Sequence, residues 1–271
     1  LLEAEVLELK RPDNIVIFWD VDAPATLDRL QQNPADPFRQ LIPRYDLILT
    51  YGGGDPVVEA YTALAARQCV PIYNALDTAT HFPVEPNPRF AADLGFLGNR
   101  LPDREARVEE FFFKAAAMLP AKRFLLGGSG WDDKPRPTNV AYLGHVYTRD
   151  HNAFNVTPTA VLNISRESMA RYGFSPATRV FEAVGAGACL ITDAWRGIEQ
   201  FLAPGEEVLV AHSGEQVAEI LDRLSPARTR AVGAAALARV LAEHTYAHRA
   251  AQLEALLAGR DRPALTRREA I

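Results

Sequence analysis

The sequence predicts an α/β protein with two doubly wound parallel-sheet domains, and three observations support this. Its 271 residues suffice for one or two domains. Short apolar runs alternate with segments of helical spacing, which is typical of parallel strands joined by helical crossovers. The runs are nearly continuous over roughly 4–8 residues, as expected for strands buried on both faces.

Nine apolar runs are predicted to form strands. Most are rich in β-branched or aromatic residues and lie beside glycine or proline. In chain order they are Asn14–Trp19, Tyr45–Tyr51, Cys69–Tyr73, Asp93–Leu97, Arg123–Leu126, Val140–Leu143, Ala160–Ile164, Ala188–Thr192 and Glu207–Val210.

Amphipathic or alanine-rich segments between these runs are predicted to form helices. Ser175 is a good N-cap and Pro176 a good first residue, so we expect one helix to begin there and to end near Gly185. The other expected helices are Pro56–Arg67, Asp103–Met118, Gly214–Leu224 and Pro226–Ala258.

A proline-rich segment, Phe82–Pro88, is expected to separate the two domains, because its three prolines fit neither a helix interior nor a central strand. The predicted domains are residues 1–84 and 85–271, the second with the last helix. The first contains only three strand runs, and the chain opens without methionine on what resembles a helix end. We therefore expect the first domain to be incomplete and the chain to belong to a longer protein.

Composition excludes several classes of protein. A net charge of −5 and the lack of a long basic cluster argue against a nucleic-acid partner. No apolar run reaches the ~18 residues of a membrane span, so no integral membrane segment is expected. The two cysteines, Cys69 and Cys189, lie in apolar runs, as expected for reduced thiols in a cytoplasmic protein.

Ligands of open parallel sheets bind beyond the carboxyl ends of the strands, and three segments there carry suitable residues. Gly98–Arg100, with Arg104 nearby, could hold a phosphate, although the segment taken alone favours a plain turn with surface arginines. The glycines of Gly127–Trp131 match neither a P-loop nor a dinucleotide-binding motif. Arg179 and Glu182 share one helix face, where they could meet a phosphate and a sugar diol or form only a surface ion pair.

Several sequence segments together resemble the CgeB-like (spore maturation protein) glycosyltransferases of the GT-B superfamily. They are Trp19–Leu27, Tyr51–Gly54, Phe96–Arg100, Tyr142–Val146 and Arg166–Met169 continuing through Arg179–Ala183. The resemblance covers most of the chain and implies a GT-B-like fold of two Rossmann-like domains. It also implies transfer of a hexose from a nucleotide-diphosphate sugar to an acceptor that the sequence does not identify.

The resemblance also implies donor-binding residues. Glu182 would bind the ribose hydroxyls, and the turn Gly144, His145 and Val146 would pack on the base. Asn99 and Arg100 would neutralise the pyrophosphate, and the helix start near Ser175 and Thr178 would be a second phosphate site. Arg166 and Arg179 complete the predicted set. Many retaining GT-B enzymes carry a further glutamate eight positions before the residue matching Glu182, where this chain has Phe174.

Asp20 and Asp22 follow the first strand and are the predicted catalytic residues, since an inverting transfer needs a base for the acceptor hydroxyl. Capping carboxylates before Pro24 explain them equally. GT-B enzymes do not require a bound metal, so neither metal nor cofactor is expected. Two alternatives remain open: a nucleotide-sugar epimerase or hydrolase, and a non-catalytic nucleotide-sugar-binding scaffold.

Overall fold

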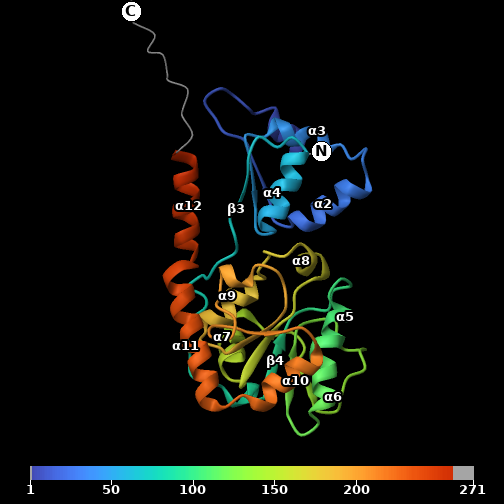
Figure 1. The fold of residues 1–271 in the computed structure, drawn as a ribbon, viewed down its shortest axis with the longest axis vertical. Coiled ribbons are helices and arrows are strands. Elements are labelled where there is room, and N and C mark those ends of the chain that lie inside the picture. Colours follow the sequence, from blue (N-terminus) through green and yellow to red (C-terminus); the bar gives the residue numbers. More distant parts are fainter. Residues whose placement is uncertain (1, 259–271) are drawn as a thin grey trace, which may run out of the picture. The chain divides into compact units, whose positions relative to one another are not determined.

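A computed structural model describes residues 2–258, which form two compact units (Figure 1). One contains residues 2–73 and 247–258, and the other is Asn74–Tyr246. The boundary between the units therefore lies at residues 73–74, before the proline-rich segment, whereas the sequence predicted it at residue 84. The reason is that the chain joins the second unit at once: Leu76 forms a parallel bridge with Thr245.

The first unit holds a parallel sheet in the order β1-β2-β3. The strands are β1 (Ile17–Asp20), β2 (Leu47–Thr50) and β3 (Cys69–Pro71). Its helical elements are α1 (Leu2–Leu7), α2 (Ala23–Gln32), α3 (Phe38–Leu41), η1 (Ile42–Arg44), α4 (Gly54–Ala63) and α12 (Tyr246–Ala258), whose first residue is counted with the second unit.

The last predicted helix is in fact two helices that belong to different units. It breaks at His244–Thr245, because Leu76 bonds to the chain there: its N–H donates to the His244 carbonyl, and its carbonyl accepts from Tyr246. After the break, α12 packs Leu253 and Leu256 against the first sheet. Residues 259–271, the end of the predicted second domain, lie outside the described residues.

The second unit holds six parallel strands in the order β6-β5-β4-β7-β8-β9. All nine predicted strands are therefore present, with ends shifted by a few residues. The strands are β4 (Leu94–Leu97), β5 (Phe124–Gly127), β6 (Val140–Tyr142), β7 (Ala160–Asn163), β8 (Leu190–Asp193) and β9 (Leu209–Ala211). Strand order reverses between β4 and β7, and such a switch point is where open α/β sheets bind ligands.

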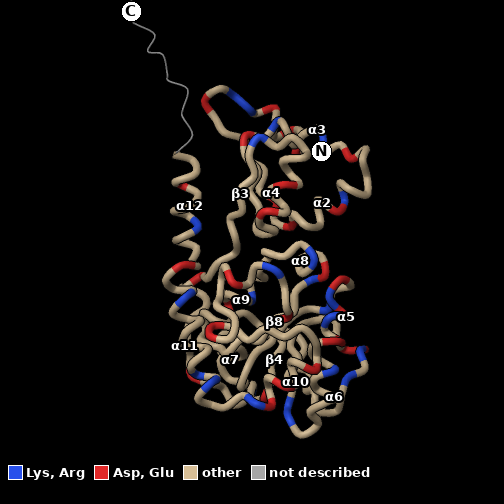
Figure 2. The backbone as a smooth tube through the Cα atoms, viewed as in Figure 1, with Lys and Arg blue, Asp and Glu red and all other residues tan. Residues whose placement is uncertain are grey.

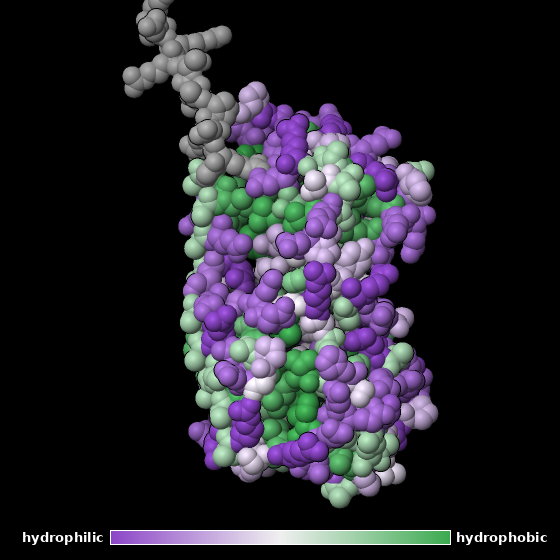
Figure 3. Space-filling model, in the orientation of Figure 1, coloured by the Kyte–Doolittle hydropathy of each residue, from purple (hydrophilic) through white to green (hydrophobic). Residues whose placement is uncertain are grey.

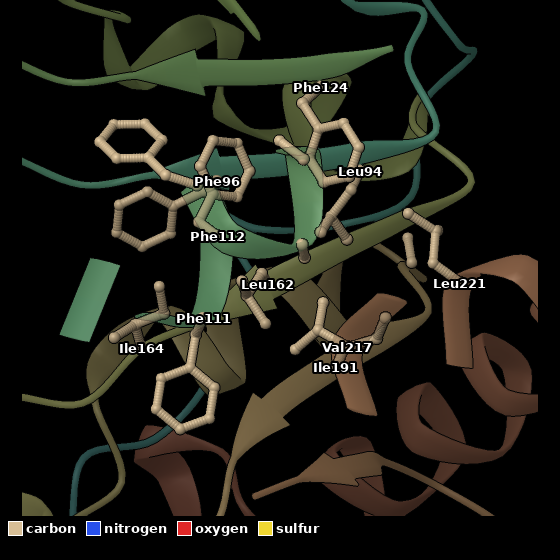
Figure 4. Packing of buried hydrophobic residues seen from close by; sticks show 14 of the residues in the cluster. Leu94, Phe96, Phe111, Phe112, Phe124, Leu162, Ile164, Ile191, Val217 and Leu221 are labelled. Atoms are coloured by element: carbon tan, nitrogen blue, oxygen red, sulfur yellow. The ribbon is translucent and has the colours of Figure 1, made fainter. Parts of the chain in front are cut away.

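Helices cover both faces of this sheet (Figure 1). The predicted helix Asp103–Met118 forms as α5, a π-helical turn η3, and α6, and it packs with α10 over the largest apolar cluster (Figure 4). On the other face, Phe154 of α7 packs beside Leu125. The second unit's helical elements are η2 (Pro88–Phe90), α5 (Glu105–Val108), η3 (Glu109–Phe113), α6 (Lys114–Met118), α7 (Thr148–Val156), α8 (Glu167–Tyr172), α9 (Thr178–Gly185), η4 (Ile198–Gln200), α10 (Gly214–Arg223) and α11 (Pro226–Glu243).

Two local predictions near the site were wrong. Helix α9 begins at Thr178 with Ala177 as its N-cap, because Ser175 is buried and its hydroxyl donates to the Gly173 carbonyl. The segment after Arg166, for which no helix was predicted, forms α8.

Apolar residues also reach the surface, as the green areas in Figure 3 show. In the first unit, Ile15, Trp19 and Val21 are exposed in or beside the edge strand β1. No helix among residues 2–258 is both long and apolar enough to cross a membrane.

Candidate functional site

Two arginine side chains converge on the turn that follows β4, beside the switch point of the second sheet. A methyl group at Gly98 would lie 3.0 Å from Nη2 of Arg179 and 3.3 Å from Nη2 of Arg104. Arg104 precedes α5 and Arg179 lies in the first turn of α9, so the topology brings two distant segments together. Glycine at position 98 leaves room for both guanidinium groups.

These two arginines are held by neutral groups. Arg104 donates to the Asn99 carbonyl at 2.6 Å, and Arg179 lies 3.4 Å from Oδ1 of Asn163. Both guanidinium groups also lie over the ring of Phe96, at 6.0 and 5.6 Å from its centroid. Within residues 2–258, neither arginine forms an ion pair, and the buried Nε of Arg104 has no hydrogen-bond partner.

Burial of these cations makes them receptive to an anion. Desolvation, together with the nearby charge of Arg104, lowers the pKa of Arg179 to about 10. Burial also lowers the pKa of Arg104, which remains cationic at neutral pH. Two desolvated guanidinium groups without a carboxylate match the charge and the planar, bidentate geometry of phosphate recognition.

Neighbouring arginines are, by contrast, neutralised within the protein. Arg107 pairs with the fully buried Asp193 at 2.7 Å and with Glu167 at 3.1 Å. Arg166, a predicted donor ligand, pairs with Asp103 at 2.6 Å. Figure 2 shows both basic and acidic residues around α5, α8 and α9, in keeping with these ion pairs.

Arg100 is also held by carboxylates. It donates to both oxygens of Glu105 at 2.8 Å and to Asp133 at 2.8 Å. The role of Arg100 at a pyrophosphate stays a prediction, and Arg104 is the better placed of the two. Asn99 accepts a bond from the Ser129 amide at 2.9 Å, which joins the two glycine turns.

Glu182 lies on α9, one turn beyond Arg179, as its spacing predicted. Within the described chain the two side chains form no ion pair, so the surface-pair interpretation is not supported. The half-buried carboxylate of Glu182 instead lies 3.6 Å from Nε2 of the buried His81. The sequence offered no signal for His81 beyond its place near the proline-rich segment.

The predicted base-binding turn lies beyond β6. Gly144 has a φ of 69°, which favours glycine, and its carbonyl accepts from the Gly128 amide at 2.8 Å. His145 is exposed and packs on Tyr147, while Val146 is buried and its carbonyl lies 3.1 Å from Nε2 of His151. The turn therefore presents backbone groups from a fixed conformation.

Of the two predicted phosphate ligands near α9, only Thr178 is accessible. It is exposed and is the first residue of the helix, where N–H groups point outward. Ser175 is buried and committed to the Gly173 carbonyl.

Asp20 and Asp22 lie in the first unit, after β1. Asp20 is 4% exposed and accepts hydrogen bonds from the Tyr61 hydroxyl, from the Thr26 hydroxyl at 3.1 Å and from the Asp22 amide at 3.1 Å. Burial raises the pKa of Asp20 and, with the Asp20 charge, that of Tyr61. These bonds are those of a carboxylate that closes a turn, whereas Asp22 is half-buried at the N-cap of α2.

Across the part of the chain that the structure describes, no group of three or more His, Cys, Asp or Glu side chains is arranged to hold a metal ion.

Comparison with known families decides the assignment. The family model described as "glycosyl transferase-like" matches residues 104–255, which is more than half of the chain and includes Arg104, Arg179 and Glu182. The chain belongs to the glycosyl transferase-like family. A search of curated protein sequences found no significant match.

Solved structures confirm the predicted GT-B fold of this family member. HepE from Anabaena, solved with UDP-glucose, has a TM-score of 0.68 at 13% identity over 91% of this chain and 73% of its own. Trehalose 6-phosphate synthase from Burkholderia multivorans has a TM-score of 0.64 at 14% identity, over 95% and 74%. Sucrose-phosphate synthase from Thermosynechococcus elongatus has a TM-score of 0.61 at 17% identity; the chain spans only 60% of its length.

Proposed function

We propose that this protein transfers a sugar from a nucleoside diphosphate donor, and the observation that carries the proposal is the pair Arg104 and Arg179. Two desolvated guanidinium groups, which form no ion pair within residues 2–258, would bind a diphosphate at the switch point of the parallel sheet. Glu182 would accept hydrogen bonds from the ribose, and the turn at Gly144–Val146 would contact the base. The fold shared with HepE, which was solved with UDP-glucose, supports this arrangement.

The proposed chemistry is cleavage of the bond between the anomeric carbon and the diphosphate oxygen. As that bond breaks, negative charge grows on the leaving diphosphate while the sugar becomes oxocarbenium-like. Arg104, Arg179 and the N-terminus of α9 would stabilise the leaving charge. A base would take the proton of the attacking acceptor hydroxyl.

We propose Asp22 as that base in preference to Asp20. The oxygens of Asp20 already accept three hydrogen bonds within the first unit. Asp22 follows the same strand end and is less buried.

The finer assignment is a metal-independent hexosyltransferase of CgeB type. It is supported by the segments Trp19–Leu27 and Arg179–Ala183. Whether transfer inverts or retains the anomeric configuration is left to product analysis.

A donor panel tests the proposal. Thermal shift should be measured with UDP, GDP and dTDP and with their glucose or mannose conjugates, and it should reveal one preferred nucleobase. Binding is detectable in this way because a ligand at 100 times its Kd stabilises a fold by about 2.7 kcal/mol. Nucleoside diphosphate release should require an acceptor and persist in EDTA. A folded protein that binds none of these ligands would contradict the proposal, and an EDTA-sensitive reaction would overturn metal independence.

A further inference from the structure

A buried histidine lies directly behind the proposed ribose ligand. His81 ends a turn that Asp77 closes: the Asp77 carboxylate accepts from the Ala79 amide at 2.9 Å and the Thr80 hydroxyl at 2.6 Å, and its carbonyl accepts from the His81 amide. The ring then reaches Glu182 on α9 through Nε2, at 3.6 Å, and α7 through Nδ1. A histidine side chain with 8% exposure is thus fixed at both nitrogens.

The neighbour on α7 determines which nitrogen carries a proton. Asn152 donates its amide Nδ2 to the Thr80 carbonyl at 3.0 Å, so its Oδ1 is the atom that faces Nδ1 of His81, at 3.3 Å. A carbonyl oxygen only accepts, and therefore Nδ1 bears hydrogen.

This arrangement has a consequence at the other nitrogen. A neutral ring protonated on Nδ1 would turn the lone pair of Nε2 toward the Glu182 carboxylate, which is repulsive. A ring protonated on both nitrogens donates to Oδ1 of Asn152 and forms an ion pair with Glu182, whose carboxylate lies 3.6 Å from Nε2.

We propose that His81 is a positioning residue that, as an imidazolium, fixes the Glu182 carboxylate for the ribose hydroxyls of the donor. This inference rests on the proposed function, because Glu182 has a ligand only if a nucleotide binds. It adds a residue from the segment before β4 to a site otherwise built at the strand ends.

The groups that face His81 also connect the ribose site to the base site. Asp77 on its own turn interacts electrostatically with His81, and Glu182 on α9 lies 3.6 Å from its Nε2. His151 on α7 lies with its ring stacked on that of His81, at 6.3 Å between centroids, and its Nε2 meets the carbonyl of Val146. The ribose ligand and the base-binding turn are therefore linked through two histidines.

The test measures discrimination between a nucleotide and its 2′-deoxy counterpart. We would titrate UDP and GDP, each against its 2′-deoxy form, by calorimetry with wild type, His81→Leu, His81→Gln and Glu182→Gln. A merely structural role would weaken both forms equally and leave their Kd ratio unchanged. His212→Gln, at an exposed histidine, is the matched control.

His81→Leu should reduce the preference for the ribose form by on the order of tenfold, the effect of one hydrogen bond to a charged group. When His81→Leu is combined with Glu182→Gln, the Kd ratio should be the same as in Glu182→Gln alone. His81→Gln keeps a neutral donor, so it should retain part of the preference.

The inference would be overturned if His81→Leu left the ratio of the Kd values for the ribose and 2′-deoxy forms unchanged. It would also be overturned if His81→Leu reduced this ratio equally in wild type and in Glu182→Gln. Neither result would contradict nucleotide binding itself. Failure of the wild type to bind either nucleotide would instead overturn the proposed function, and the inference with it.

Discussion

Ionisable residues at the carboxyl ends of the two sheets lie in different environments. After β1, Asp20 is buried and its oxygens are occupied by the hydroxyls of Tyr61 and Thr26 and the amide of Asp22. After β4, Arg104 and Arg179 are desolvated, and within residues 2–258 neither forms an ion pair. Both edges carry ionisable residues where an α/β sheet binds ligands, but the oxygens of Asp20 are occupied by hydrogen bonds, whereas the buried Nε of Arg104 has no partner in the described chain. Occupancy of the hydrogen-bonding atoms thus separates a structural group from a binding group better than position does.

The largest effect expected from this comparison concerns Asp22. Asp22→Asn should lower kcat by roughly 10²–10⁴-fold, because it removes the proposed base, and should leave the melting temperature nearly unchanged. Steady-state kinetics with thermal melts would check this.

Asp20→Asn is the contrasting variant. It should destabilise the fold by about 1–3 kcal/mol, since the buried Tyr61 hydroxyl would lose its charged acceptor. Full activity in Asp22→Asn, or lost activity without destabilisation in Asp20→Asn, would reverse the roles assigned to the two carboxylates.

The second prediction sharpens the contrast among the arginines themselves. Arg104→Gln and Arg179→Gln should each weaken nucleoside diphosphate binding by about 10- to 100-fold, the usual effect of losing a charge-assisted hydrogen bond. Arg100→Gln, whose guanidinium is held by Glu105 and Asp133, should weaken it by less than about threefold. Isothermal titration calorimetry would compare the Kd values of the three variants. An equal loss of affinity in Arg100→Gln would show that ion pairing within the protein does not distinguish an arginine that leaves the diphosphate unbound from one that binds it.

The smallest expected effect concerns Glu105, the carboxylate that pairs with Arg100. Hydrogen bonds from Arg100 and Lys134 lower the pKa of Glu105 from 4.5 to about 2. Because the folded pKa lies below the unfolded one, Glu105 stabilises the fold above pH 4.5 and loses this contribution as pH falls toward 2.

Glu105→Gln should therefore lower the melting temperature slightly at pH 7 and not at all near pH 2. Thermal melts across that range would test it. A melting-temperature difference that does not vary with pH would contradict the role of the ion pairs.

Much of the fold was predictable because strands buried on both faces leave a strong apolar signal. All nine strands were found in this way, and so was the helix pattern over Glu105–Met118. Short polar helices such as α8 were missed, because hydrophobic periodicity has little to detect in six residues. The break at His244–Thr245 depends on a bridge to Leu76, which no local sequence pattern encodes.

The site was predictable in part for a similar reason. The spacing of Arg179 and Glu182 is local, so helix geometry alone places them on one face. Whether Arg100 or Arg104 is free depends on Glu105 and Asp133, and the latter comes from a loop far along the chain. The contact of His81 with Glu182 joins residues about one hundred positions apart and follows only from the fold.

A crystal structure of the protein with bound UDP tests the central claim most directly. The account predicts diphosphate oxygens within hydrogen-bond distance of the guanidinium groups of Arg104 and Arg179, with the ribose hydroxyls on Glu182. A diphosphate bound at Arg100, or a nucleotide held away from the turn after β4, would contradict the claim that arginines without an ion pair in the described chain mark the donor site.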